Sequence, residues 1–290
     1  MLDPEGLAQQ SVPGRGKPLV RLVARGLQAS TYSVRRDGRR YAMRLPLAPA
    51  AIRPAAAAPP WEQRVFTAAA QAGLGPAIRH SDPASGIVVT EWVRGRRWTR
   101  AEVTHGINIR RFAMLVRRIQ ALSPLRPHYA RQPADWIHHY REIAGRGGAI
   151  EAFAAGLAGE AERQLELLAR LPAHPDVLCH SDLHRHNLID GAAGLIALDW
   201  EYAHFSDPYW DLAGWLSAND LGALHRERLL AGFLGRGPDR AQIERLTRLT
   251  WLYDYVCVLW SHAYRGQFAA PVGAAVARRA RKLMARLSRA

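Results

Sequence analysis

The chain contains the stretch CHSDLHRHNLI at residues 179–189, and the stretch GLIALDWEYA follows it at residues 194–203. These stretches supply an aspartate, Asp182, an asparagine five residues later, Asn187, and a second aspartate after an apolar run, Asp199. Phosphoryl transfer from ATP depends mainly on positioning and on cations, so it needs a group that orients the acceptor hydroxyl and oxygen ligands for Mg²⁺. We therefore predict that Asp182 is the catalytic base and that Asn187 and Asp199 bind Mg²⁺.

The same residues resemble the catalytic loop of the aminoglycoside phosphotransferase and choline kinase superfamily, whose members are related to protein kinases. The block LIALDWEYAHFSDPYWDLA at residues 195–213 resembles the choline, ethanolamine and thiamine kinase branch. Ser181 departs from the pattern, since glycine or asparagine is common at that position. The resemblance implies a bilobal protein-kinase-like α+β fold, with a small antiparallel sheet in one lobe and mostly helices in the other. It also implies ATP and Mg²⁺ as cofactors.

The order of the expected elements agrees with two lobes, a nucleotide-binding lobe at residues 1–92 and a helical lobe with the catalytic loop and acceptor site at 93–290. The first dozen residues are expected to be loose. The first lobe is expected to contain a helix from 61 to about 73 and strands at 19–25, 31–36, 40–45, around 78 and at 86–92. In the second lobe, helices are expected near 112–122, 135–144, 150–171, 209–218, 221–234, 241–264 and 274–287. The Ala/Pro-rich segment 46–60 is predicted to be a mobile loop.

The phosphate-binding cation is expected on the third strand. In YAMRL at residues 41–45, strand alternation puts Ala42 and Arg44 on one face, and this is similar to the kinase Ala-x-Lys pattern with arginine in place of lysine. Arg44 is the candidate for the α- and β-phosphates, and a solvated strand arginine is the alternative. Glu62 begins the following helix and is the candidate ion-pair partner of Arg44. A first-turn acid that only stabilises the helix dipole is the alternative for Glu62.

Two further segments are candidates for nucleotide binding. The turn at residues 26–30 lies where kinases carry their glycine-rich loop, but it has one glycine and lacks the usual fingerprint. Its backbone N–H groups and Ser30 are candidates for phosphate binding. Glu91 and Val93 belong to the expected hinge, whose backbone would pair with adenine. An ordinary strand end is the alternative there.

The acceptor is predicted to be a small cationic alcohol of the choline, ethanolamine or thiamine type. Aromatic faces and carboxylates hold such a cation by cation–π attraction and by opposite charge. The candidate substrate-binding residues are Trp200, Glu201, Tyr202, Asp207, Trp251 and Tyr255. Because aromatic residues at helical spacing also form cores, a structural role is the alternative for them. An aminoglycoside or sugar kinase and a catalytically silent nucleotide-binding protein remain alternatives for the function.

The formal net charge of +15 raises the question of nucleic-acid binding. The arginines are spread along the chain, so we expect no specific nucleic-acid partner and instead a positive field that favours triphosphates. The other expected partners are ATP and the small-molecule acceptor, and the sequence gives no indication of the oligomeric state.

Two cysteines, Cys179 and Cys257, are too few for a disulfide framework and agree with a reducing compartment. No apolar run reaches the length of a membrane span, and the N-terminus lacks a signal pattern, so a cytoplasmic protein is expected. A transition-metal cluster such as a zinc centre, built from His180, His184 and His186 with Cys179 and Asp182, is a minor alternative, because thiolate and imidazole are standard zinc ligands.

Overall fold

The computed structural model describes residues 3–26, 29–47, 59–122, 129–146, 156–264, 266–267 and 270–287. Contacts divide the chain into two compact units. The sheet unit contains residues 1–98, 122–127 and 186–203, and the helical unit contains residues 99–121, 128–185 and 204–290. The catalytic segment is therefore shared, since its residues from His186 onward group with the sheet. Two consecutive domains that meet at Trp92 were expected, and that boundary stays a prediction.

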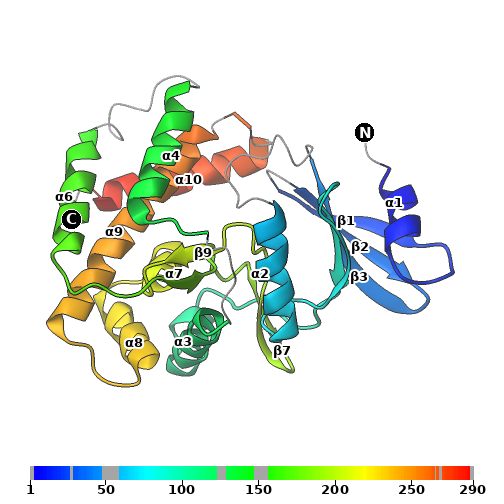
Figure 1. Ribbon diagram of the computed structural model, residues 1–290, viewed down its shortest axis with the longest axis horizontal. Helices are drawn as coiled ribbons and strands as arrows, with labels where there is room; N and C mark the ends of the chain where they lie inside the picture. The colour runs from blue at the N-terminus through cyan, green and yellow to red at the C-terminus, as the bar shows by residue number, and fades with distance from the viewer. Residues whose placement is uncertain are drawn as a thin grey trace. The chain divides into compact units, whose positions relative to one another are not determined.

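The sheet unit contains a five-stranded antiparallel sheet with the strand order β1-β2-β3-β5-β4 (Figure 1). Its strands are β1 (Leu19–Arg25), β2 (Ala29–Arg36), β3 (Arg39–Pro46), β4 (Ile78–Asp82) and β5 (Ile87–Glu91). The expected five strands are confirmed. Asp37 and Gly38 connect β2 to β3 with positive φ angles of 48° and 74°. These angles match the twist of a tight hairpin and are tolerated by aspartate and glycine.

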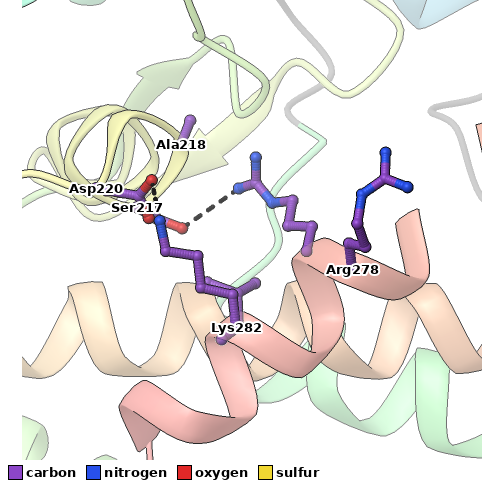
Figure 2. Close-up of a pocket in the computed structure, with 7 residues that line it drawn as sticks. Ser217, Ala218, Asp220, Arg278 and Lys282 are labelled. Carbon is purple, nitrogen blue, oxygen red and sulfur yellow. Dashed lines mark hydrogen bonds and ion pairs between the residues drawn. The ribbon is translucent and has the colours of Figure 1, made fainter. Parts of the chain in front are cut away.

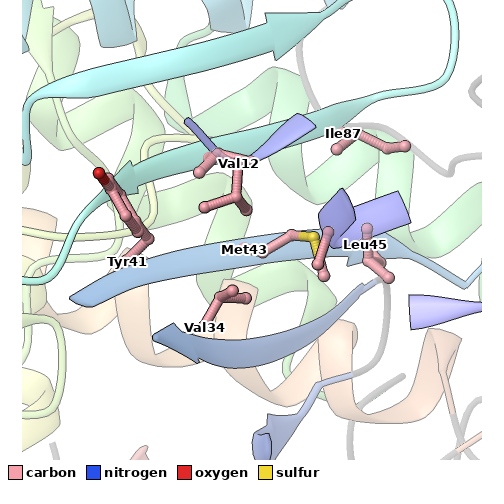
Figure 3. Packing of buried hydrophobic residues seen from close by; sticks show 8 residues of the cluster. Val12, Val34, Tyr41, Met43, Leu45 and Ile87 are labelled. Atoms are coloured by element: carbon pink, nitrogen blue, oxygen red, sulfur yellow. The ribbon is translucent and has the colours of Figure 1, made fainter. Parts of the chain in front are cut away.

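Strand alternation gives the sheet two different faces. On β3, Tyr41, Met43 and Leu45 are buried in a core cluster on one face (Figure 3). Arg44 projects from the opposite face because side chains alternate along a strand. Helix α2 (Pro59–Gln71) lies on the Arg44 face, since its Glu62 contacts that arginine. The sheet therefore separates an apolar core from a face that carries charged residues.

Helix α1 (Pro4–Ser11) covers the apolar face, where Ala8 and Val12 join the core cluster (Figures 1 and 3). The expectation of a loose N-terminus is wrong for this segment. Asp3 caps the helix by accepting a hydrogen bond of 3.1 Å from the Glu5 backbone N–H. The buried guanidinium of Arg36 donates to backbone carbonyls at the end of the helix, including that of Gln9 at 3.0 Å. Arg36 lies on β2, so a residue from a distant strand holds the end of this short helix, which has few apolar residues of its own.

The second part of the sheet unit is the hairpin of β7 (Leu188–Gly191) and β8 (Gly194–Ala197). Ala197 N donates to Leu74 O at 2.7 Å, which connects β8 to the turn after α2. The indole of Trp61 on α2 donates to Ala203 O at 2.7 Å. The segment that carries Asp199 is thus tied to α2 and its following turn on both sides of that residue.

The helical unit contains a helix for each of the seven that were expected. They are α3 (Gly106–Gln120), α4 (Pro133–Arg146), α6 (Ala158–Ala169), α7 (Trp210–Asn219), α8 (Ala223–Leu234), α9 (Arg240–Ala263) and α10 (Ala270–Leu287). A 3-10 turn at Glu102–Thr104 and the strand pair of β6 (Val177–Cys179) and β9 (His204–Ser206) complete it. Residues 150–155 of the expected helix at 150–171, and most of the loop at 46–60, lie outside the described residues.

Helix α9 is the centre of the helical unit and packs against α4, α6, α7 and α10. Its buried residues include Leu252, Tyr255 and Leu259, so the helix is apolar on most of its surface. On α3, the apolar side chains at helical spacing are buried, and Phe112 stacks on Trp215 of α7 with ring centroids 3.9 Å apart. No helix in the described part of the chain has the length and apolar character that crossing a membrane requires.

Candidate active site

In the sheet unit, Arg44 is the centre of an ionic cluster. Its Nη1 lies 2.9 Å from Glu62 Oε1, its Nη2 lies 3.3 Å from Asp199 Oδ1, and the same Nη2 is paired with the Glu201 carboxylate. The ion pair predicted between Arg44 and Glu62 is confirmed. Glu201 was predicted to bind the acceptor, but the structure places its carboxylate on Arg44, which favours a role in holding the guanidinium.

The cluster has more negative than positive charge, since three carboxylates surround one guanidinium. Burial opposes the charged form of Arg44, but Asp199, Glu201 and Glu62 outweigh it and raise the pKa of Arg44. Burial, followed by repulsion from Asp199, raises the pKa of Glu201 above its usual range, although Arg44 acts in the opposite direction. Asp199 is the accessible member, with 41% of its side chain exposed against 10% for Glu201. A surplus of accessible carboxylate oxygen is what a hard divalent cation requires.

The two predicted metal ligands lie on neighbouring backbone segments. Leu198 N donates to Asn187 O at 2.8 Å, so the residue before Asp199 is tied directly to Asn187. Asp199 has a left-handed backbone with φ +64°, a conformation that aspartate tolerates better than most residues. The donor set of a carboxylate and an amide oxygen fits Mg²⁺ rather than zinc. Among the residues described, no three His, Cys, Asp or Glu side chains group as ligands for a metal ion.

In the helical unit, a buried carboxylate holds the loop that carries Asp182. Asp211, which is 1% exposed, accepts hydrogen bonds from His180 N at 2.9 Å and Ser181 N at 2.7 Å. Burial raises the pKa of Asp211 to about 6, although the two backbone N–H groups lower it. Tyr253 Oη donates to Ser181 O at 3.0 Å from the other side. Ser181, the residue before Asp182, is therefore fixed at both its N–H and its carbonyl.

The side chain of Ser181 is also held. Its Oγ lies 3.0 Å from His204 Nδ1, and Trp136 Nε1 lies 3.2 Å from His204 Nε2. Because an indole N–H can only donate, His204 Nε2 accepts and Nδ1 carries the proton that is donated to Ser181. The φ of Ser181 is +69°, which explains why glycine or asparagine is common there. Serine meets this backbone requirement with a hydrogen bond that glycine lacks.

Asp182 itself is partly exposed, with 31% of its side chain accessible, and His184 Nε2 lies 3.6 Å from its Oδ1. A carboxylate that is accessible on a loop fixed by buried residues is suited to orienting a substrate hydroxyl. The contacts of Asp211, Tyr253 and His204 were not found from the sequence. The one signal available for Asp211 in the sequence is its position as the only charge in the apolar helix α7.

The predicted nucleotide-binding residues lie at different positions in the sheet. Ala42 shares the face of Arg44, next to Thr90 on β5. Ser30 is 2% exposed and pairs with Leu45, so its side chain lies on the opposite face from Arg44. This placement favours a backbone role at position 30 over a role for the hydroxyl.

At the expected hinge, the Glu91 carboxylate pairs with Arg79, and Glu91 N donates to Ala77 O at 2.8 Å. Val93 is partly buried, and none of the described residues accepts a hydrogen bond from its backbone N–H. The hinge backbone at Val93 is therefore available for a base.

Most of the predicted acceptor residues are in the interior. Asp207 is 7% exposed, and its Oδ2 lies 2.9 Å from Nε of the buried Arg245. Trp200 and Trp251 are 3% and 7% exposed, and Tyr255 is fully buried. Trp200 donates to a backbone carbonyl at 3.1 Å, and Arg141 donates to Tyr255 Oη at 3.1 Å. Tyr202 is partly buried. These placements favour structural roles for the buried members, and their acceptor roles stay predictions.

The fold and the site define a protein-kinase-like phosphotransferase. The sheet unit carries the Arg44–Glu62 pair, and the helical unit carries the fixed Asp182 loop. The model of the family described as "Phosphotransferase enzyme family" matches residues 20–246. The chain therefore belongs to this family, and the protein is a phosphotransferase that acts on a hydroxyl group.

Solved structures of the same fold include several small-molecule kinases. A choline/ethanolamine kinase family protein from Mesorhizobium loti has a TM-score of 0.73 at 22% identity, over 93% of this chain and 90% of that chain. Choline kinase LicA from Streptococcus pneumoniae has a TM-score of 0.77 at 20% identity, over 97% and 98%. The amicoumacin kinase hAmiN, solved with AMP-PNP, Ca²⁺ and Ami, has a TM-score of 0.69 at 14% identity, over 97% and 92%. A comparison with curated protein sequences gives no match.

Proposed function

We propose that the protein transfers the γ-phosphate of ATP, with Mg²⁺, to the hydroxyl of a small alcohol. The observation that carries this proposal is the ionic cluster in which Arg44 is oriented by Glu62 and Glu201 beside the accessible carboxylate of Asp199. Such a cluster combines a fixed cation for phosphates with an anionic site for a metal ion. Membership of the phosphotransferase family supports the reaction class.

Arg44 would bind the inner phosphates through the donors of its guanidinium that face away from Glu62. Asn187 and Asp199 would hold Mg²⁺, which when bound neutralises the charge that develops on the triphosphate. Val93 would donate its backbone N–H to the base, and Ala42 leaves room for a ring against the sheet. The AMP-PNP in the amicoumacin kinase structure supports a nucleotide in this fold.

Asp182 would accept a hydrogen bond from the acceptor hydroxyl and align its oxygen for in-line attack on the γ-phosphorus. As the new O–P bond forms and the bond to ADP breaks, the hydroxyl proton passes to Asp182. Asp211 and Tyr253 keep the loop in place during this step without touching the reacting atoms. Their contribution is positional, because a misplaced base loses most of its effect.

For the acceptor, we propose a small cationic alcohol of the choline, ethanolamine or thiamine type. The block at residues 195–213 and the fold shared with choline kinases support this class. An aminoglycoside or sugar acceptor is the second candidate, because the fold is also shared with the amicoumacin kinase. A cytoplasmic location would give access to ATP and agrees with the free thiols of Cys179 and Cys257.

The test is Mg²⁺-dependent ADP release with choline, ethanolamine, thiamine, amino sugars and aminoglycosides as acceptors. Asp182→Asn should lower kcat by about 10²- to 10⁴-fold, because it removes the proton acceptor but keeps the side-chain shape. Asp176→Asn, at an aspartate that binds Gln132 elsewhere in the helical unit, is the matched control and should keep full activity. Full turnover by the Asp182 variant on a good acceptor would refute the proposed role of that residue. Tight Mg-ATP binding without stimulation by any acceptor would favour a catalytically silent protein.

A further inference from the structure

The helical unit contains a cavity of about 220 Å³ between the end of α7 and helix α10 (Figure 2). Ser217 and Asp220 line it from the α7 side, and Arg278, Arg279 and Lys282 line it from α10. The cavity has no aromatic residue in its wall. Its charge is positive, since three cations face one carboxylate.

The carboxylate in this wall is already compensated. Lys282 Nζ lies 2.6 Å from Asp220 Oδ2, and Arg100 Nη2 lies 3.4 Å from the same oxygen. Arg286 approaches Asp220 to 3.9 Å and is paired with the buried Asp254. The positive charge of the other two arginines in the wall is therefore surplus, and α10 has no acidic residue that could balance it.

Arg279 is the surplus cation that contacts both α7 and α9. Its Nη2 lies 3.5 Å from Ser217 Oγ, which is the outer limit of a hydrogen bond, and it also contacts the Cys257 thiol. A guanidinium has five N–H donors, so most of them have no acceptor among the described residues. This leaves a fork of donors on a residue that lines the cavity.

One residue of the cavity wall interacts electrostatically with the catalytic loop. Arg279 is close enough to Tyr253, Asp254 and Asp182 for electrostatic interaction with each of them. Tyr253 in turn donates to Ser181 O at 3.0 Å, one residue before the proposed base. A ligand that contacts Arg279 would therefore lie near the group that orients the acceptor hydroxyl.

We infer that this cavity binds an oxyanion, a carboxylate or phosphate, and that the oxyanion is part of the acceptor whose hydroxyl Asp182 orients. This inference rests on the proposed phosphoryl transfer to a hydroxyl, and it replaces the purely cationic acceptor proposed above with one that also carries an oxyanion. The planar fork of Arg279 matches both kinds of oxyanion, and Arg278 and Lys282 add favourable charge. A purely cationic acceptor would be repelled by Arg279, whereas a hydroxy acid or an amino alcohol that also carries a carboxylate would satisfy it. Free inorganic phosphate has the same chemistry and must be distinguished by experiment.

The first arm of the test compares acceptors that differ only in a carboxylate, serine against ethanolamine and homoserine against 3-aminopropanol. For the wild type we expect kcat/KM to be about 10- to 100-fold higher for the carboxylated member of the pair. Arg279→Met should abolish this preference, and Arg279→Lys should keep part of it. Arg281→Met is the matched control, because Arg281 is an exposed residue of the same helix that does not line the cavity. Equal use of both members, or a preference that survives in Arg279→Met, would overturn the inference.

The second arm measures thermal stabilisation by inorganic phosphate without nucleotide in the same variants. The anion site predicts that Arg279→Met loses part of the phosphate response that the wild type and Arg281→Met retain. Identical responses in all three proteins would overturn the site. The stabilisation by phosphate could depend on Arg279 while the enzyme shows no preference for the carboxylated acceptors that it turns over. This result would overturn the claim that the anion is part of the acceptor, and it would favour free phosphate as the ligand. If no acceptor is turned over by the wild type, the proposed function fails on this panel, and the phosphate arm decides the anion site separately.

Discussion

Replacing Asp211 by asparagine tests how the catalytic loop is held. The carboxylate uses one oxygen for His180 N and the other for Ser181 N, at 2.9 and 2.7 Å. Asparagine keeps one acceptor oxygen, but its NH₂ group faces a backbone N–H that it cannot accept from. The expected structural result is one intact hydrogen bond and one pair of opposed donors in a site that is 1% exposed.

The magnitude follows from two opposing effects. Losing a charge-assisted hydrogen bond and leaving a buried donor unpaired costs about 3–5 kcal/mol. Removing a buried charge offsets this, because burial raises the pKa of Asp211 from 3.8 to about 6, and about two pKa units correspond to about 3 kcal/mol. The net destabilisation at pH 7 is then about 0–2 kcal/mol, so the variant should fold. Its kcat should fall by about 10²-fold or more, because the base is no longer held in place.

The pH dependence of stability gives the sharper result. The native state binds the Asp211 proton more tightly than the unfolded state does, so this residue makes the protein less stable as pH rises from about 4 to about 6. The variant lacks this contribution. The free energy of unfolding of the wild type minus that of Asp211→Asn should therefore decrease by about 2 kcal/mol between pH 4 and pH 7. Urea unfolding of both proteins across this range measures it, and a difference that does not change with pH would refute the reasoning.

Three further substitutions test the interior by urea unfolding. Arg245→Met should destabilise the protein by about 3–5 kcal/mol, because it leaves the Asp207 carboxylate buried without its cation, and adding Asp207→Asn should recover part of this loss. Gly95→Ala should destabilise it by about 1–3 kcal/mol or more, since φ is +156° and a Cβ would lie 2.5 Å from a carbonyl oxygen of β7. Phe112→Ala should cost about 3–5 kcal/mol by removing the ring stacked on Trp215, and a cost below 1 kcal/mol would mean that this contact is not part of the core.

The elements of the fold could be predicted because their signals are local. Alternation in β3 predicted the faces of Ala42 and Arg44, and Asp37-Gly38 is a residue pair typical of a hairpin turn. Apolar periodicity located all seven helices. The N-terminal helix was missed because its order comes from the Arg36 guanidinium on a distant strand, and no pattern within eight residues reports such a partner.

The site was predictable in part for the same reason. The Arg44–Glu62 pair follows from the order of strand and helix, but the pairing of Arg44 with Glu201 joins residues 157 positions apart. The sequence shows that Glu201 is acidic, but it does not show that the carboxylate pairs with Arg44. A carboxylate in a motif therefore has a predictable charge but an unpredictable partner, and the partner decides whether it is available to a substrate.

The charge of the acceptor is where this distinction matters most. The abundance of tryptophan and tyrosine in the second half of the chain favours a cationic acceptor, because aromatic faces attract cations. A ligand meets only accessible faces, however, and Trp215, Trp251 and Tyr255 are each less than 8% exposed. The cavity between α7 and α10 is lined mainly by arginine and lysine instead. These cations belong to a helix that looks in the sequence like an ordinary solvated amphipathic face. Composition therefore favours a positive charge on the acceptor, whereas the burial of the aromatic residues and the cationic cavity favour a negative one. The Arg279→Met comparison separates these two possibilities, because only recognition of a negative group depends on that guanidinium.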